Sequence, residues 1–239
     1  MSEKKEPRLA LELYLVRHGQ SQGNIGYEGI NPSEDELWDP KLTELGQKQA
    51  ELLGERFSDF AFDHILASPY ARATATGYAV AMQQPENGCH DLELHPLFCE
   101  CGMSENPGKT IETIRQTYPN TRKAVGAEGY ERLIYNDKTP EDEERMNRAK
   151  TMIKYLTDRF HNGEKVLVAA HACFNTFLIF AALGLSTEQG FDFANGNTGV
   201  TKILFYEEGT GKYGDRVLVY HNDQSHLFRD FRGIQLDET

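Results

Sequence analysis

Arginine and histidine side chains follow closely after three apolar stretches of the chain. Arg17 and His18 come after LELYLV. Arg72 comes shortly after FDHILAS, and His171 follows VLVAA. The forked donors of arginine match pairs of phosphate oxygens, and nearby positive charge favours a neutral imidazole with a free ring nitrogen. These residue types indicate phosphoryl transfer through a phosphohistidine.

The position of these residues at the ends of predicted strands adds weight to this interpretation. In an open α/β sheet the carboxyl ends of parallel strands lie on one edge, where ligands bind. Gly19 allows a sharp turn after the first strand, and Arg72 lies in the first turn of a predicted helix, where free amides favour an anion. A single arginine or histidine at a strand end can simply meet solvent, whereas four at equivalent junctions favour one shared site.

Hydrophobic patterning predicts strands that alternate with helices. Helices are predicted at residues 42–57 with Thr43 as N-cap, after Ser68 as N-cap with Pro69 next, and at residues 139–163. Residues 166–170 are continuously apolar, which is typical of a central strand covered on both faces, and residues 200–206 and 216–221 form a closing hairpin. The pattern predicts a three-layer α/β/α fold with a mostly parallel sheet of about six strands.

Composition limits the classes of partner. The 239 residues include 37 acidic and 25 basic ones, for a formal charge of −12, which argues against a nucleic-acid partner or an anionic membrane surface. The first residues, MSEKKEPR, lack the apolar core of a secretory signal, and the apolar stretch 176–185 is too short to span a bilayer. The four cysteines are too scattered for a disulfide framework. A cytoplasmic location is expected.

Several motifs together resemble those of the histidine phosphatase superfamily, which includes cofactor-dependent phosphoglycerate mutase. LVRHGQSQGN resembles its RHG signature, SPYARATATG its second arginine motif, and VLVAAHACFN its second histidine motif. DPKLTELGQKQA and HNDQSHL extend the similarity over almost the whole chain. The resemblance implies a phosphoglycerate mutase-like fold and a single domain over residues 1–239, with an insertion at about 99–139 that roofs the pocket.

The resemblance also implies roles for individual residues. His18 would be the nucleophile. Three residues would form the phosphate clamp, namely Arg17, Arg72 and His171. Three more would supply further donors to the phosphate: Ser21, Asn24 and Ala172. A loop asparagine such as Asn24 can instead bond its own backbone, and the sequence leaves both interpretations open.

The general acid implied by the resemblance is Glu100 in LFCEC, because the family often places this glutamate shortly after a strand. Glu105 is the second candidate, and either carboxylate could be a solvated loop charge. Ala172 stands where the family usually has glycine, a change that should leave the backbone amide available.

The stretch after the proposed acid favours hydrolysis over mutase chemistry. The ERHYG-type sequence of a mutase is missing, since Glu100 is followed by CGM. A mutase must hold the carboxylate of its substrate and rephosphorylate it, whereas a phosphatase needs only to admit water. The sequence therefore predicts a metal-independent phosphomonoesterase that needs no cofactor and acts on a small-molecule phosphate ester. The alternatives are a phosphomutase and a phospho-ligand binding module without turnover.

Metal-ligand residue types also occur close together in the sequence, at His90, His95, Cys99 and Cys101. Their spacing fits no usual zinc pattern, and two side chains five residues apart on a regular strand project from opposite faces. No metal site is predicted from them.

Overall fold

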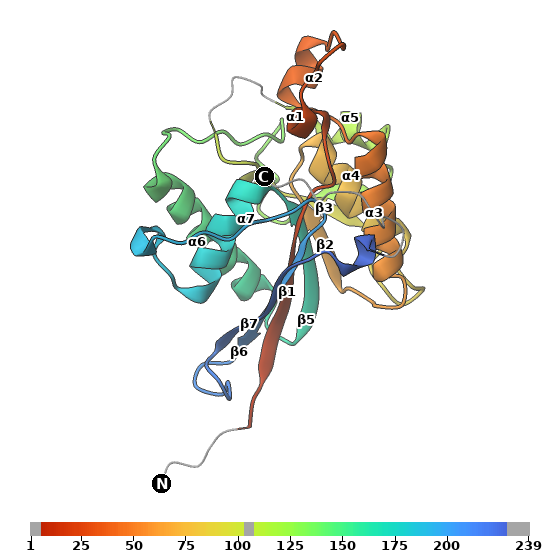
Figure 1. Ribbon diagram of the computed structural model, residues 1–239. Coiled ribbons are helices and arrows are strands. Elements are labelled where there is room, and N and C mark those ends of the chain that lie inside the picture. Colours follow the sequence, from red (N-terminus) through yellow and green to blue (C-terminus); the bar gives the residue numbers. More distant parts are fainter. Residues whose placement is uncertain (1–5, 103–107, 229–239) are drawn as a thin grey trace.

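A mixed sheet forms the centre of the computed structural model, which describes residues 6–102 and 108–228 (Figure 1). In that part of the chain the sheet has seven strands in the order β4-β3-β2-β5-β1-β6-β7. The strands are β1 Leu9–Arg17, β2 His64–Ala67, β3 Leu92–Leu94, β4 Thr121–Lys123, β5 Glu164–Ala170, β6 Val200–Tyr206 and β7 Arg216–Asp223. The pairings from β4 to β1 are parallel, whereas β6 and β7 are antiparallel. The predicted parallel sheet with a closing hairpin is confirmed.

Helices cover both faces of the sheet, α3 and α4 on one and α6 and α7 on the other (Figure 1). They are α1 Gln22–Ile25, α2 Glu34–Trp38, α3 Glu44–Arg56, α4 Ala71–Met82, α5 Ile111–Arg115, α6 Asp142–Arg159 and α7 Ala172–Leu183, with short 3-10 turns at Pro96–Phe98, Thr187–Gln189 and Ser225–Leu227. Alternate residues of β1 enter the two cores: Leu13 packs with α6 and α7, and Tyr14 packs with α3 and α4. The predicted three-layer α/β/α architecture is confirmed.

Strand β5 lies in the middle of the sheet. The five residues 166–170 are fully buried, because β5 lies between β1 and β2 and is covered by helices on both faces. Its continuous apolar sequence is therefore explained by its central position.

The structure differs from the sequence predictions at several places. The helix predicted over residues 139–163 begins at Asp142, after the N-cap Glu141, and ends at Arg159. Strand β4 was not predicted: it is a three-residue edge strand whose TRK sequence has no apolar period, and it lies within the segment 99–139. The prediction of Ser68 as the N-cap of α4 is wrong, since the helix begins at Ala71 after the N-cap Tyr70. The Ser68 hydroxyl is instead 2.8 Å from a ring nitrogen of His171.

Within residues 6–102 and 108–228, we find no helix with both the length and the apolar character needed to cross a membrane.

A close backbone contact fixes the loop after β1 against helix α3. A Cβ atom at Gly46 would overlap the carbonyl oxygen of Gln20, and a Cβ at Gly19 would overlap the carbonyl oxygen of Gly46. Both glycines are therefore required by space, and their contact holds the residues that follow His18.

We expect Gly46→Ala to destabilise the protein although it lies inside a helix. Alanine is the better helix former by about 1 kcal/mol, but overpacking against backbone typically costs about 1–3 kcal/mol. Urea unfolding should show a net loss of free energy of unfolding. Gly129→Ala is the matched control, because a Cβ there has nothing within 4 Å. A Gly46→Ala protein as stable as its parent would show that the contact can open without cost.

Candidate active site

The register of the parallel strands brings three strand ends to one edge of the sheet. Arg17 at the end of β1 is aligned with Ala170 at the end of β5, and β2 ends beside the same strand. The residues that follow are His18, His171 and Ser68. The imidazole rings of the two histidines lie 5.3 Å apart, centroid to centroid, in an edge-to-face arrangement.

The hydrogen bonds of His18 fix its tautomer. Its Nδ1 lies 2.7 Å from the carbonyl oxygen of Gly19, and a carbonyl oxygen can only accept, so Nδ1 carries the proton. Its Nε2 accepts from Nε of Arg72 at 3.2 Å. The Nε2 lone pair is therefore directed toward the arginine that would hold a phosphate.

Burial and positive charge keep both histidines neutral. Burial is the largest cause that lowers the pKa of His18 well below its usual value, followed by the charge of Arg72, while the contact with Gly19 works in the opposite direction. Burial and the charge of Arg72 also lower the pKa of His171 well below the usual value. A neutral imidazole is the form that can act as a nucleophile.

The two arginines are positioned by different elements. Arg72 is the second residue of α4, and its guanidinium carbon lies 4.6 Å from the ring centroid of Tyr70. Arg17 ends β1 and donates from Nη1 to the carbonyl oxygen of Asn195 at 2.7 Å. Both charges lower the pKa of His18, which shows that both act on the same imidazole.

His171 lies at the boundary between β5 and α7. It is fully buried, with Nε2 2.8 Å from the hydroxyl oxygen of Ser68. Ser68 also accepts from the backbone N–H of Tyr70 at 3.3 Å, so its own proton can go to Nε2. Among the described residues His171 Nδ1 has no hydrogen-bond partner, which leaves it as a donor for a bound oxyanion.

The carboxylate of Glu100 is held at the N-terminus of α7. It accepts from the backbone N–H groups of Cys101 at 2.8 Å, Phe174 at 3.0 Å and Cys173 at 3.4 Å. The first residue of this helix is Ala172, directly after His171. The structure therefore brings Glu100 to the same helix terminus as the second histidine.

Ser21 and Asn24 bond to each other beside the end of β1. Asn24 Oδ1 accepts from the backbone N–H of Ser21 at 2.9 Å and from its hydroxyl at 3.1 Å. This is the local role that the sequence left open for Asn24. An asparagine amide also carries two N–H donors, so the local bond is compatible with donation to a ligand.

Comparison with known proteins identifies the family. The model of the histidine phosphatase superfamily, branch 1, matches residues 13–213. The chain belongs to this superfamily.

Relatives of this histidine phosphatase carry both mutase and phosphatase names. A protein named probable phosphoglycerate mutase GpmB from Escherichia fergusonii is 26% identical over 218 residues, which are 91% of this chain and 95% of the relative. Phosphoserine phosphatase 1 of Hydrogenobacter thermophilus is 26% identical over 208 residues, 82% of this chain and 88% of the relative.

A solved structure shares the fold. The phosphoserine phosphatase of Entamoeba histolytica, in complex with 3-phosphoglyceric acid, matches with a TM-score of 0.59 and 22% identity over 91% of this chain and 99% of its own. This match supports the phosphoglycerate mutase-like fold implied by the motifs.

The cysteine and histidine residues considered as metal ligands are not brought together. Cys99 is buried, with its sulfur 3.9 Å from the hydroxyl of Ser68, and His95 Nδ1 accepts from a backbone N–H at 3.1 Å. In the described ranges, the one group of three possible ligands includes Cys101 but not His90, His95 or Cys99. Glu105, the second candidate for the acid, lies outside the described residues.

Sequence reasoning missed a loop that supports the first two residues of the RHG motif. Asn197 Nδ2 donates to the carbonyl oxygen of His18 at 2.9 Å, and the backbone N–H of Thr198 donates to that of Arg17 at 3.0 Å. In the same loop, the backbone carbonyl oxygen of Asn195 accepts from Nη1 of Arg17. The available signal was the Asn- and Gly-rich stretch ANGNTG just before β6, because an antiparallel strand begins at the edge where its neighbour β1 ends.

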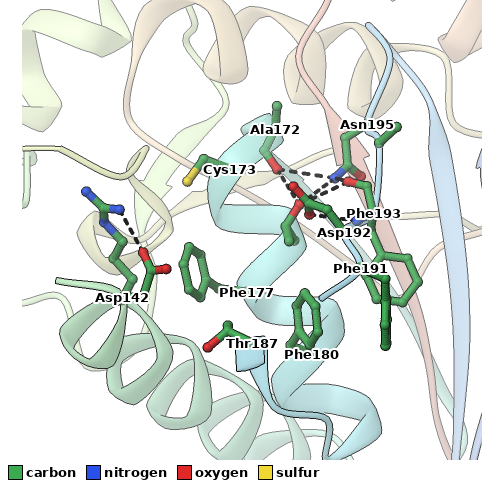
Figure 2. Close-up of a pocket in the computed structure, with 13 residues that line it drawn as sticks. Asp142, Ala172, Cys173, Phe177, Phe180, Thr187, Phe191, Asp192, Phe193 and Asn195 are labelled. Atoms are coloured by element: carbon green, nitrogen blue, oxygen red, sulfur yellow. Dashed lines mark hydrogen bonds and ion pairs between the residues drawn. The ribbon is translucent and has the colours of Figure 1, made fainter. Parts of the chain in front are cut away.

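A cavity of about 420 Å³ extends along α7 from the same helix terminus (Figure 2). Ala172 and Asn195 line it near the clamp, and aromatic rings line its other part. These rings are Phe177, Phe180, Phe191 and Phe193. Cys173 also lines the cavity, so its thiol can be reached from this side.

The neutral histidines predict that the protein is less stable in acid. In the unfolded state a histidine takes up a proton below its pKa of about 6.5, whereas the pKa values of folded His18 and His171 lie well below that value. The contribution of these two histidines to the free energy of unfolding is therefore fully present above about pH 6.5 and decreases as the pH is lowered further. Each such histidine contributes a slope of about 1.4 kcal/mol per pH unit. Urea unfolding of His18→Gln should therefore show a shallower fall than the parent between about pH 6 and 5. Exposed His90→Gln is the control for the loss of one histidine. Equal slopes for His18→Gln and its parent would show that folded His18 is protonated.

Proposed function

We propose that this histidine phosphatase is a metal-independent phosphomonoesterase that hydrolyses a small-molecule phosphate ester through a phosphohistidine on His18. It would need no cofactor. The observation that carries the proposal is the neutral His18, whose Nε2 faces the guanidinium of Arg72 at 3.2 Å. A nucleophile and a phosphate-binding group thus point at the same place.

In the first step His18 Nε2 would form a bond to phosphorus while the bond from phosphorus to the ester oxygen breaks. Arg17, Arg72 and the N–H of His171 would neutralise the charge on the non-bridging oxygens. The Nδ1 proton of His18 stays on Nδ1, which donates to the carbonyl oxygen of Gly19 at 2.7 Å and so stabilises the positive ring of the phosphohistidine. Glu100, after taking a proton from solvent, would give it to the departing alkoxide.

In the second step the Glu100 carboxylate would remove a proton from water as the water oxygen attacks the phosphohistidine. The N–P bond breaks, inorganic phosphate leaves, and His18 returns to its neutral form. The three backbone N–H bonds to Glu100 support this role, because they orient the carboxylate at the terminus of α7.

Hydrolysis is preferred over phosphoryl return for a reason in the sequence. Glu100 is followed by CGM in place of the mutase-type stretch, and relatives include proteins named phosphoserine phosphatase.

The four cysteines are free thiols, which supports a reducing compartment such as the cytoplasm.

A panel of phosphate esters that includes phosphoserine and 3-phosphoglycerate tests the assignment of hydrolysis. Phosphate release supports it, whereas isomerisation of phosphoglycerate without release would assign a mutase.

We expect rapid acid-free quenching during turnover to trap an acid-labile phosphoryl group on His18. His18→Ala should lose both the label and turnover, because no other group would supply the nucleophilic nitrogen. Labelling with ³²P-ester followed by peptide mapping measures this. A His18→Ala protein with near-normal turnover would show that the mechanism is wrong.

We expect Glu100→Gln to affect esters according to their leaving groups. An alkoxide needs a proton to depart, so phosphoenzyme formation from an alkyl phosphate should slow on the order of 10²–10⁴-fold, whereas p-nitrophenolate can leave unaided. Single-turnover bursts with both esters measure this step without interference from dephosphorylation.

Asp63→Asn serves as the control for the loss of one carboxylate, because Asp63 lies just before β2, at the opposite end of that strand from Ser68. Equal burst losses for the two esters would exclude Glu100 as the acid, and Glu105→Gln would then be tested in the same way.

A further inference from the structure

A carboxylate and two thiols meet at the N-terminus of α7. One oxygen of Glu100 and the sulfur atoms of Cys101 and Cys173 all lie within 4.8 Å of one another. Glu100 and Cys101 come from the loop after the turn Pro96–Phe98, and Cys173 is the second residue of α7. Segments more than 70 residues apart in sequence thus supply three donor atoms to one point.

The charges around this cluster balance one another. Arg148 lies 4.0 Å from the sulfur of Cys101 and forms a buried ion pair of 2.9 Å with Asp137. Arg145 pairs with Asp142 at 3.0 Å and with Asp137 at 3.7 Å. Two arginines and two aspartates cancel, so the net charge of the cluster is set by Glu100 and the thiols.

The cluster can be reached from solvent. All three donor residues are half-buried, and Cys173 lines the cavity of about 420 Å³ together with Asp142. Figure 2 shows the sulfur of Cys173 at the cavity wall, on the side of Asp142. An ion that enters this cavity therefore has a path to the donor atoms.

We propose that Glu100, Cys101 and Cys173 bind a thiophilic divalent cation of the Zn²⁺ class. Two thiolates and a carboxylate are a donor set that Zn²⁺ accepts, with water as the fourth ligand. Metal–sulfur bonds of about 2.3 Å in a tetrahedron place the donor atoms about 3.8 Å apart, within the observed limit of 4.8 Å. Binding releases the thiol protons, and the two thiolates and Glu100 then neutralise the divalent cation and leave one negative charge on the occupied site.

The site would make the enzyme sensitive to metal. This consequence depends on the proposed function, because it assumes that Glu100 is the acid and base of the reaction. A carboxylate bound to the cation cannot give a proton to the leaving group or take one from water. Bound Zn²⁺ would therefore slow hydrolysis of an alkyl phosphate on the order of 10²-fold, like the loss of an acid–base group.

Binding is tested first without activity, with Co²⁺ as a spectroscopic substitute and a phosphine reductant that keeps the thiols reduced. We expect one Co²⁺ per chain with an intense sulfur-to-cobalt charge-transfer band. Cys101→Ser and Cys173→Ser should each remove or strongly weaken the band, whereas Cys89→Ser should retain it because Cys89 lies outside the cluster. Absence of the band, or its survival in both variants, would overturn the proposal.

Inhibition is tested second, with Zn²⁺ and an alkyl phosphate. The parent and Cys89→Ser should be inhibited and then restored by a chelator. Cys101→Ser and Cys173→Ser, each compared with its own rate in the absence of metal, should resist Zn²⁺, which separates this site from binding to the active-site histidines. Inhibition of these two variants as strong as that of the parent would overturn the proposed inhibition. A protein that shows the cobalt band yet is not inhibited would retain the metal site and count against Glu100 as the acid.

Discussion

The parallel pairing of β1 with β5 is the constraint on which the site depends. It aligns Arg17 with Ala170, so the two histidines that follow these strands come within 5.3 Å of each other. A shift of one residue would turn every side chain of β1 to the other face and bury Tyr14 in the wrong core. The same alignment places the start of α7, which follows β5, beside the loop that leads into β6, the other neighbour of β1. The strand pairing that stabilises the sheet therefore also sets the geometry of the site.

The positive charge of the two arginines has two effects in the site. The arginines suited to hold a phosphate also lower the pKa of His18 and so keep its nitrogen unprotonated. Burial acts in the same direction on His171. The positive charge that would suit a phosphate thus also keeps the proposed nucleophile unprotonated, at the cost of stability in acid. The carboxylate of Glu100 is held by backbone N–H groups at the N-terminus of α7.

Much of this arrangement could be predicted from sequence, because long apolar periods and strand-end residues carry strong signals. The order of layers, the central position of β5 and the grouping of Arg17, His18, Arg72 and His171 are of this kind. Strand β4 could not be predicted from the sequence, because three polar residues at a sheet edge show no alternation of apolar and polar side chains. Ser68 was misread because a serine before proline has the local signature of a helix cap, whereas its partner here is a histidine 103 residues away. A contact between residues so far apart in the chain cannot be predicted from a single sequence.

The central pairing has a further consequence for synthesis of the chain. Strand β1 is made early, but its parallel partner β5 follows about 150 residues later. At roughly 5–20 residues per second, the apolar segment LELYLVR waits on the order of 10–30 s with both edges exposed. The antiparallel partner β6 emerges later still. The nascent chain therefore carries an aggregation-prone strand through most of translation, and we expect its yield in cells to depend on chaperones that cover this segment.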